Sequence, residues 1–160
     1  MSKNIPKLIL IVGTMLTLIV TIGAQAVFFG GEELTLLPLE QVAEPELPRE
    51  ILLWLDRDKC SEGYGAFFLG GDLYLAARMG ECPTGGYAVR LGSPRMDKSE
   101  AVITAAFIRP KPWDMVIQVL TYPRTVVRIA AAGNCPPRVT FMGDDEKVLA
   151  SVEVVRLDEE

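Results

Sequence analysis

The sequence contains no histidine among its 160 residues. This absence excludes serine–histidine–aspartate and cysteine–histidine catalysis, histidine-ligated zinc and proton transfer by imidazole. Lys and Arg number 16 against 21 Asp and Glu, and they are scattered along the chain. The dense basic face that nucleic-acid phosphates require is therefore lacking. We expect no nucleic-acid partner, no metal, no cofactor and no catalytic residue.

Cysteine is also scarce, and its odd count leaves one thiol over. Cys60, Cys82 and Cys135 lie in expected loops or at the ends of expected elements. In an oxidising compartment, two of the three are expected to pair. We predict a disulfide between Cys82 and Cys135, because each directly precedes a proline at a chain reversal. Pairing of Cys60 with Cys82 is the alternative.

The long hydrophobic run of this chain lies at its N-terminus. Lys3 and Lys7 precede a charge-free stretch over 8–31, which contains the small-residue site Ala24-Gln25-Ala26. This order is typical of a secretory signal peptide cleaved after the second alanine. The alternative is an uncleaved anchor, because 8–29 is just long enough to cross a bilayer. Both predict export: the chain is extracellular or at the cell surface, and an uncleaved anchor tethers it to the cytoplasmic membrane through 8–29.

The rest of the chain divides into a lead-in and one domain. Residues 1–26 are the signal peptide or anchor, and 27–47 form an acidic lead-in that contains prolines. We interpret the lead-in as a tether or as an extended strand. Residues 48–160 form a mainly β domain of ordinary size.

One short helix is predicted at the start of this domain. Apolar residues at helical spacing follow Pro48, which is well placed at a helix start, and Gly63 is the expected stop. A strand over 51–55 is the alternative, because five consecutive residues do not separate the two periodicities.

Beyond Gly63 the pattern changes to short strands. Runs rich in apolar and β-branched residues alternate with glycine and proline, which is typical of a sandwich or barrel. Gly70-Gly71-Asp72 and 143–146 predict hairpin turns. We predict a mainly β fold, either an immunoglobulin-like sandwich or an open barrel of short strands, with one short N-terminal α-helix and the signal or anchor helix. The expected strands are 66–69, 73–78, 87–91, 101–108, 116–122, 125–129, 138–142 and 147–157.

Three segments in a fixed order carry a resemblance. They are Arg78-Met79-Gly80, then Pro83-Thr84-Gly85-Gly86-Tyr87-Ala88-Val89-Arg90-Leu91, and then Leu120-Thr121-Tyr122-Pro123. Together they resemble the C-terminal domain of the protease complex subunit PrcB family, over roughly 73–129. The resemblance implies an exported, mainly β, non-catalytic domain that accompanies an exported protease, and it supplies no catalytic residues.

Two of the loops are also similar to those of chagasin-like inhibitors of papain-type cysteine proteases. Residues 83–87 match one loop of that immunoglobulin-like family, and 109–113 match a second with two residues inserted. Gly92-Ser93-Pro94-Arg95 is a poor counterpart of the third loop. Inhibition of cysteine proteases is therefore an alternative function.

Trp113 is a candidate contact residue on physical grounds, because an exposed tryptophan in a proline-flanked loop can anchor an interface. Its alternative position is folded over the edge of the core. Carboxylates are plentiful, so a histidine-independent hydrolase of the cell envelope is a second alternative function. The leading hypothesis is a protein-binding domain whose partner is an exported protease. Its candidate binding residues are Thr84, Gly85, Gly86, Tyr87, Arg109, Trp113, Thr121 and Tyr122.

Overall fold

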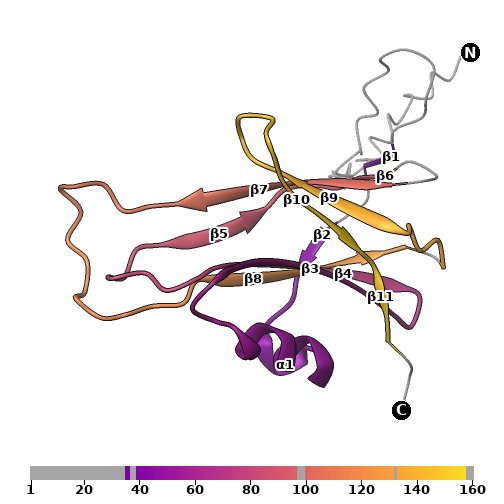
Figure 1. The fold of residues 1–160 in the computed structure, drawn as a ribbon, viewed down its shortest axis with the longest axis horizontal. Helices are drawn as coiled ribbons and strands as arrows, with labels where there is room; N and C mark the ends of the chain where they lie inside the picture. The colour runs from indigo at the N-terminus through magenta and orange to yellow at the C-terminus, as the bar shows by residue number, and fades with distance from the viewer. Residues whose placement is uncertain (1–34, 37–38, 97–99, 132, 158–160) are drawn as a thin grey trace, which may run out of the picture.

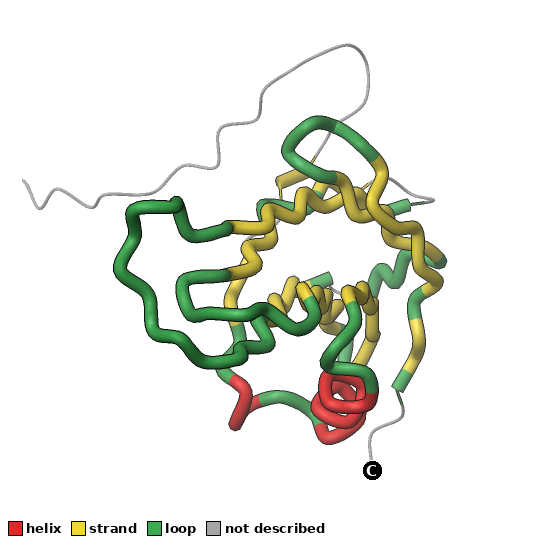
Figure 2. Tube along the Cα trace, turned by 60° about the vertical axis from the view of Figure 1, so that its left-hand side comes forward, coloured by secondary structure: helices red, strands yellow, loops and turns green. Residues whose placement is uncertain are grey.

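The computed structural model describes residues 35–36, 39–96, 100–131 and 133–157. Two β-sheets lie face to face, and one helix covers the outer side of the second sheet (Figure 1). Figure 2 shows the two layers of strands with the helix beneath them and long loops projecting to one side. The prediction of a mainly β fold with one short helix is confirmed. The expected signal or anchor helix over 1–26 lies outside the described residues.

The first sheet is built around β7 (Ala101–Ile108). On one side, β6 pairs with the beginning of β7 and β5 pairs with its end, while β9 pairs with β7 in parallel on the other side. The other strands of this sheet are β1 (Thr35–Leu36), β5 (Ala88–Leu91), β6 (Arg95–Met96), β9 (Arg138–Met142) and β10 (Val148–Glu153).

The second sheet is built around β4 (Asp72–Met79), which lies between β3 and β8. Part of the acidic lead-in forms an edge strand, because Leu39–Gln41 pairs with β8. At the other edge, the last strand, β11, pairs in parallel with β3. Because β10 belongs to the first sheet, the chain crosses from one sheet to the other between β10 and β11. The other strands are β2 (Leu39–Gln41), β3 (Glu62–Leu69), β8 (Arg124–Ala130) and β11 (Val155–Arg156).

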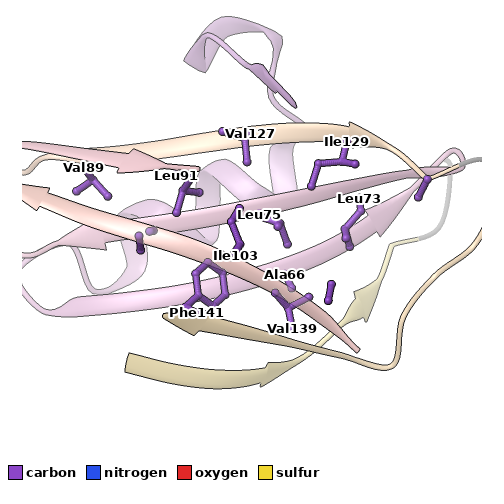
Figure 3. Close-up of a cluster of buried hydrophobic side chains, with 14 residues drawn as sticks. Ala66, Leu73, Leu75, Val89, Leu91, Ile103, Val127, Ile129, Val139 and Phe141 are labelled. Carbon is purple, nitrogen blue, oxygen red and sulfur yellow. The ribbon is translucent and has the colours of Figure 1, made fainter. Parts of the chain in front are cut away.

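The core between the sheets is formed by alternate residues of the central strands (Figure 3). Successive side chains of a strand point to opposite faces. Leu73 and Leu75 of β4 therefore reach the same interior as Ile103 of β7 and Phe141 of β9. All four side chains are almost completely buried, and each contributes about 2 kcal/mol of hydrophobic stabilisation.

The opposite face of β4 is covered by α1 (Arg49–Arg57). Ile51 and Leu55 of the helix are fully buried in a second cluster that includes Tyr74 of β4. The helical prediction is confirmed over the strand alternative for 51–55, because a helix places residues four apart on one buried stripe.

Gly63 does not stop the helix, and that prediction is wrong. The helix ends at Arg57, and Gly63 lies within β3 opposite Arg78. The Arg78 guanidinium donates to the carbonyl oxygen of Trp54 at 2.8 Å and lies 4.5 Å from the centroid of its ring. A Cβ at residue 63 would lie only 2.6 Å from the Arg78 Nε atom. Gly63 therefore makes room for the arginine that binds the end of the helix.

Both expected hairpins are present. Gly70 and Gly71 have φ values of 60° and 89° between β3 and β4, and glycine adopts this region without steric cost. Between β9 and β10, the amide of Gly143 donates to the carbonyl of Lys147 at 2.8 Å. Within the described ranges, no helix has the length and apolar character needed to span a membrane.

Burial of the helix predicts a stability difference within α1. Ile51→Ala should lower the free energy of unfolding by about 2–5 kcal/mol, because the cavity lies in a fully packed cluster. Leu53 is 56% exposed on the same helix, so Leu53→Ala should change it by no more than about 0.5 kcal/mol. Urea unfolding measures both, and equal losses would contradict this packing.

An ion-pair network predicts the acid dependence of stability. Arg124 lies 2.7 Å from Glu44 and 2.6 Å from Asp56. Its hydrogen bonds hold the pKa of Glu44 below the ordinary value of 4.5 and that of Asp56 below 3.8. A lowered folded-state pKa stabilises the protein above the unfolded pKa, and this contribution disappears as pH falls. The free energy of unfolding should therefore fall between about pH 5 and pH 3. Arg124→Gln should flatten this decline, measured by urea unfolding across that range. Arg90→Gln, at an exposed position of β5, should leave the decline unchanged.

Candidate functional site

The two loops that contain the candidate residues project from the same end of the sandwich. One loop runs from β4 to β5 over 80–87, and the other runs from β7 to β8 over 109–123. β4 is antiparallel to β8, so the end of β4 lies beside the beginning of β8. β5 is antiparallel to β7, so the beginning of β5 lies beside the end of β7. Both loops lie at the left of Figure 1, at the end of the long axis opposite β1.

Hydrogen bonds join the two loops. The backbones of Cys82 and Thr121 exchange two bonds, at 2.8 and 2.9 Å, and the Gly85 amide donates to the Ile117 carbonyl at 2.9 Å. The Thr121 hydroxyl donates to the Thr84 carbonyl at 2.7 Å. We call these paired residues, 82–86 and 116–121, the loop junction. The structure thus brings together two segments that the sequence separates by about thirty residues.

Two glycines allow this close approach. A Cβ on Gly85 would lie 2.8 Å from the Ile117 Cγ1 atom, and a Cβ on Gly86 would lie 2.9 Å from the Val116 Cγ1 atom. Gly86 also has a φ of 84°, which side chains other than hydrogen rarely permit. The glycine pair is therefore required where the loops touch.

The longer loop exposes large apolar side chains, and we call residues 113–120 the apolar loop. Met115 is fully exposed and Trp113 is 76% exposed, so Trp113 is not folded over the core edge. The others are Ile117, Val119 and Leu120, which are about half to two-thirds exposed. Because exposed apolar patches are commonly binding surfaces, the apolar loop is a candidate contact surface.

A tight turn holds Trp113 in this position. The Asp114 amide donates to the Lys111 carbonyl at 3.0 Å, and the Lys111 amide donates to the Asp114 carboxylate at 2.8 Å. The Lys111 ammonium lies 5.8 Å from the centroid of the Trp113 ring. The indole is thus presented to solvent by an ordered loop.

The strand expected over 116–122 is absent, and that prediction is wrong. Thr121 makes one isolated bridge to Cys82, and the chain bends at Val119. The residues have high β propensity, but strand formation also requires a neighbouring strand along the ladder. β8 begins only after Pro123.

Tyr122 lies at the far end of the junction in an exposed polar cluster. Its hydroxyl donates to the Glu81 carboxylate at 3.1 Å, and this bond raises the pKa of the tyrosine. The Lys59 ammonium lies 4.8 Å from the centroid of the ring. Of the remaining candidates, Arg109 is exposed at the start of the longer loop, and Tyr87 is half-buried directly before β5.

The expected disulfide is absent, and all three cysteines are free thiols. Cys82 bridges Thr121 before the start of β8, whereas Cys135 follows the end of that strand. The length of β8 separates them by roughly 20 Å, while a disulfide requires Cα atoms within about 7 Å. Cys60 is exposed with its thiol 3.9 Å from the Glu81 carboxylate, and burial raises the pKa of the Cys82 thiol.

A separate hollow of about 610 Å³ lies at the opposite end of the sandwich. Glu100 and Glu153 line it together with Arg138 and Arg156. The Thr140 hydroxyl donates to the Glu100 carboxylate, so this acid already has a protein partner. In the part of the chain that the structure describes, no group of three or more Cys, Asp or Glu side chains is placed to hold a metal ion.

Four residues of the apolar loop were missed as candidates: Met115, Ile117, Val119 and Leu120. Ile117, Val119 and Leu120 fall in the strand expected over 116–122, and Met115 directly precedes it. The flanking prolines at 110, 112 and 123 were the available signal for a loop, because proline limits regular pairing on both sides.

The fold and the junction define a mainly β domain with an exposed apolar end. Residues 73–130 match the family model described as PrcB C-terminal, which confirms the resemblance expected from the sequence. The matched stretch runs from β4 to β8 and includes the loop junction and the apolar loop. Searches of curated proteins and of solved structures found no match.

The close approach at Gly86 makes a testable prediction. Gly86→Ala and Gly133→Ala both place alanine at a φ above 80°, but only the first meets neighbouring atoms within 4 Å. Backbone strain should lower the free energy of unfolding of both variants by about 1–2 kcal/mol, and the added contacts should lower that of Gly86→Ala further. Hydrogen exchange of the Gly85 and Thr121 amides should accelerate only in Gly86→Ala. Identical unfolding and exchange in the two variants would contradict the tight junction.

Proposed function

We propose that this chain is an exported, non-catalytic subunit that binds a partner protease through its apolar loop. The observation that carries this proposal is the exposure of Trp113, Met115 and Ile117 on a loop held in place by the junction. The match to the PrcB C-terminal model supports a protease-associated role.

The energetics of the loop fit docking by a few anchoring residues. Tryptophan is enriched among the residues that dominate interface energies, and methionine adapts its shape to a partner surface. Because the junction orders the loop before binding, less conformational entropy is lost on association. The apolar loop therefore combines large contact area with a prearranged backbone.

The apolar loop and β1 lie at opposite ends of the first sheet. β1 pairs with β6, which pairs with the first residues of β7, whereas the apolar loop follows the last residue of β7. The eight residues of β7 span roughly 25 Å. If residues 8–29 are retained as an anchor, the domain and its apolar loop lie outside the cytoplasmic membrane.

The cysteine-protease inhibitor is a weaker alternative. The loops over 83–87 and 109–113 do lie at one end of the domain, as that function requires. Residues 92–95 continue instead along β7, where Gly92 bonds to Thr104 and Arg95 pairs with Val102. Among the residues that the structure describes, the third loop of an inhibitory wedge therefore has no counterpart beside the other two.

Partner capture tests the proposed function. Tagged full-length chain is recovered from the cells that produce it, and casein hydrolysis is measured in the recovered material. Trp113→Ala should reduce the captured protease activity about tenfold, because loss of an anchoring aromatic costs more than 1 kcal/mol. Leu53→Ala, on the exposed side of α1, is the matched control and should leave the activity unchanged. Equal activity with both variants, or none with the native chain, would refute the proposal.

A further inference from the structure

Part of the acidic lead-in lies along the edge of the second sheet, and we call residues 39–46 the strap. Leu39–Gln41 pairs with β8, and the Val42 amide donates to the Val126 carbonyl at 3.0 Å. Before the strap, β1 pairs with β6 of the first sheet. After the strap, Leu47 is buried in the cluster that holds α1. The chain is therefore held on both sides of the strap by contacts that do not involve β8.

Little apolar contact holds the strap itself. None of its residues is buried, and only Leu39 and Val42 are partly buried. A hollow of about 230 Å³ lies beside it, lined by Val42 and Leu47 together with Leu55 of α1 and Val126 of β8. Segments with few buried apolar contacts open locally at a low free energy.

Two glutamate–arginine pairs fasten the strap to β8. The Glu44 carboxylate accepts from the Arg124 Nε and Nη2 atoms at 2.7 and 3.0 Å, and the Glu40 carboxylate accepts from the Arg128 Nη2 atom at 2.5 Å. Both glutamate side chains are more than half exposed. Because exposed ion pairs contribute little to stability, this fastening is weak.

Both arginines keep a second carboxylate when the strap leaves. Arg124 lies 2.6 Å from Asp56 of α1, and Arg128 lies 4.0 Å from Asp72 of β4. The Arg124 side chain is only 20% exposed, and a mostly buried charge that loses its partner is strongly destabilising. Asp56 prevents that loss, so the folded domain tolerates release of the strap.

We propose that the strap is a releasable cover of the second sheet, which detaches from β8 while α1, both sheets and the loop junction stay folded. The backbone groups of Val126 and Arg128 face the strap, because residues two apart in a strand direct these groups to the same side. Release uncovers them, and an uncovered sheet edge pairs readily with another extended segment. The strap therefore controls access to the edge of β8, and this role does not depend on the proposed protease partner.

Hydrogen exchange of the full-length chain in phosphatidylcholine nanodiscs tests the release, with single-residue readout by mass spectrometry. The Val42 amide reports on the strap, and the Val127 amide, which faces β4, reports on the centre of the sheet. The protection factor of Val42 should be at least about a hundredfold smaller, because exchange at Val127 requires unfolding of the domain. Equal protection of the two amides, or no protection at Val42, would overturn the releasable cover.

Charge variants test the fastening. Replacing both fastening glutamates, Glu40→Gln with Glu44→Gln, should speed exchange at Val42 about tenfold, since each exposed pair contributes a few-fold. Glu46→Gln is the matched control, because Glu46 is exposed in the same strap and takes part in no ion pair among the described residues. This control should leave exchange at Val42 unchanged. Equal exchange in the double variant and the control would show that the two pairs do not fasten the strap.

A core variant separates local release from unfolding of the domain. Phe141 is fully buried on β9, beside Tyr64 of β3 and away from the edge that the strap covers. Phe141→Leu should speed exchange at Val127 about tenfold and leave Val42 unchanged, because the released state keeps the whole core. Thermal unfolding checks that the variant is folded. Acceleration at Val42 by the same factor would show that the strap leaves only when the domain unfolds, and the proposal would be wrong.

Discussion

The burial of β4 on both faces is the constraint on which the rest of this structure depends. Leu73, Leu75 and Ala77 face the core between the sheets, while Tyr74 and Ala76 face the helix. A strand that is apolar on both sides requires a cover on each side. The first sheet provides one cover and α1 provides the other. Arg78, next to the end of the same strand, donates to the Trp54 carbonyl and lies over its ring, so β4 contacts the helix along one face and at the helix end.

The position of the apolar loop is a consequence of this frame. Because β4 and β8 are neighbouring antiparallel strands, the residues after β4 and those before β8 leave the sandwich side by side. Their meeting point is too close for side chains, which explains the two glycines at the junction. The loop between β7 and β8 is therefore held by backbone bonds near its second half, while its apolar side chains remain outside the core. Apolar side chains that stay exposed on a stable domain contribute little to folding and are suited to binding.

Much of the fold was accessible from the pattern of residues. The helix over 49–57 follows from its stripe of apolar residues, and the hairpin at Gly70-Gly71 follows from the need for positive φ. The segment over 116–122 was misassigned because its composition describes a strand whether or not a neighbouring strand exists. The disulfide was misassigned because local proline contexts carry no information on the distance between Cys82 and Cys135. In both cases the deciding quantity was a relation between distant segments.

The sequence by itself determined the absence of histidine chemistry, the mainly β class, the helix and the resemblance that the family match over 73–130 confirms. These properties depend on residue types and on periodicity within a few turns or strands. Only the tertiary structure decided that Trp113 and Met115 are exposed, that the 82–86 and 116–121 segments pair, and that Cys82 and Cys135 lie beyond opposite ends of β8. Burial and proximity are set by which strands become neighbours, and that choice is made by the packing of the whole domain around β4.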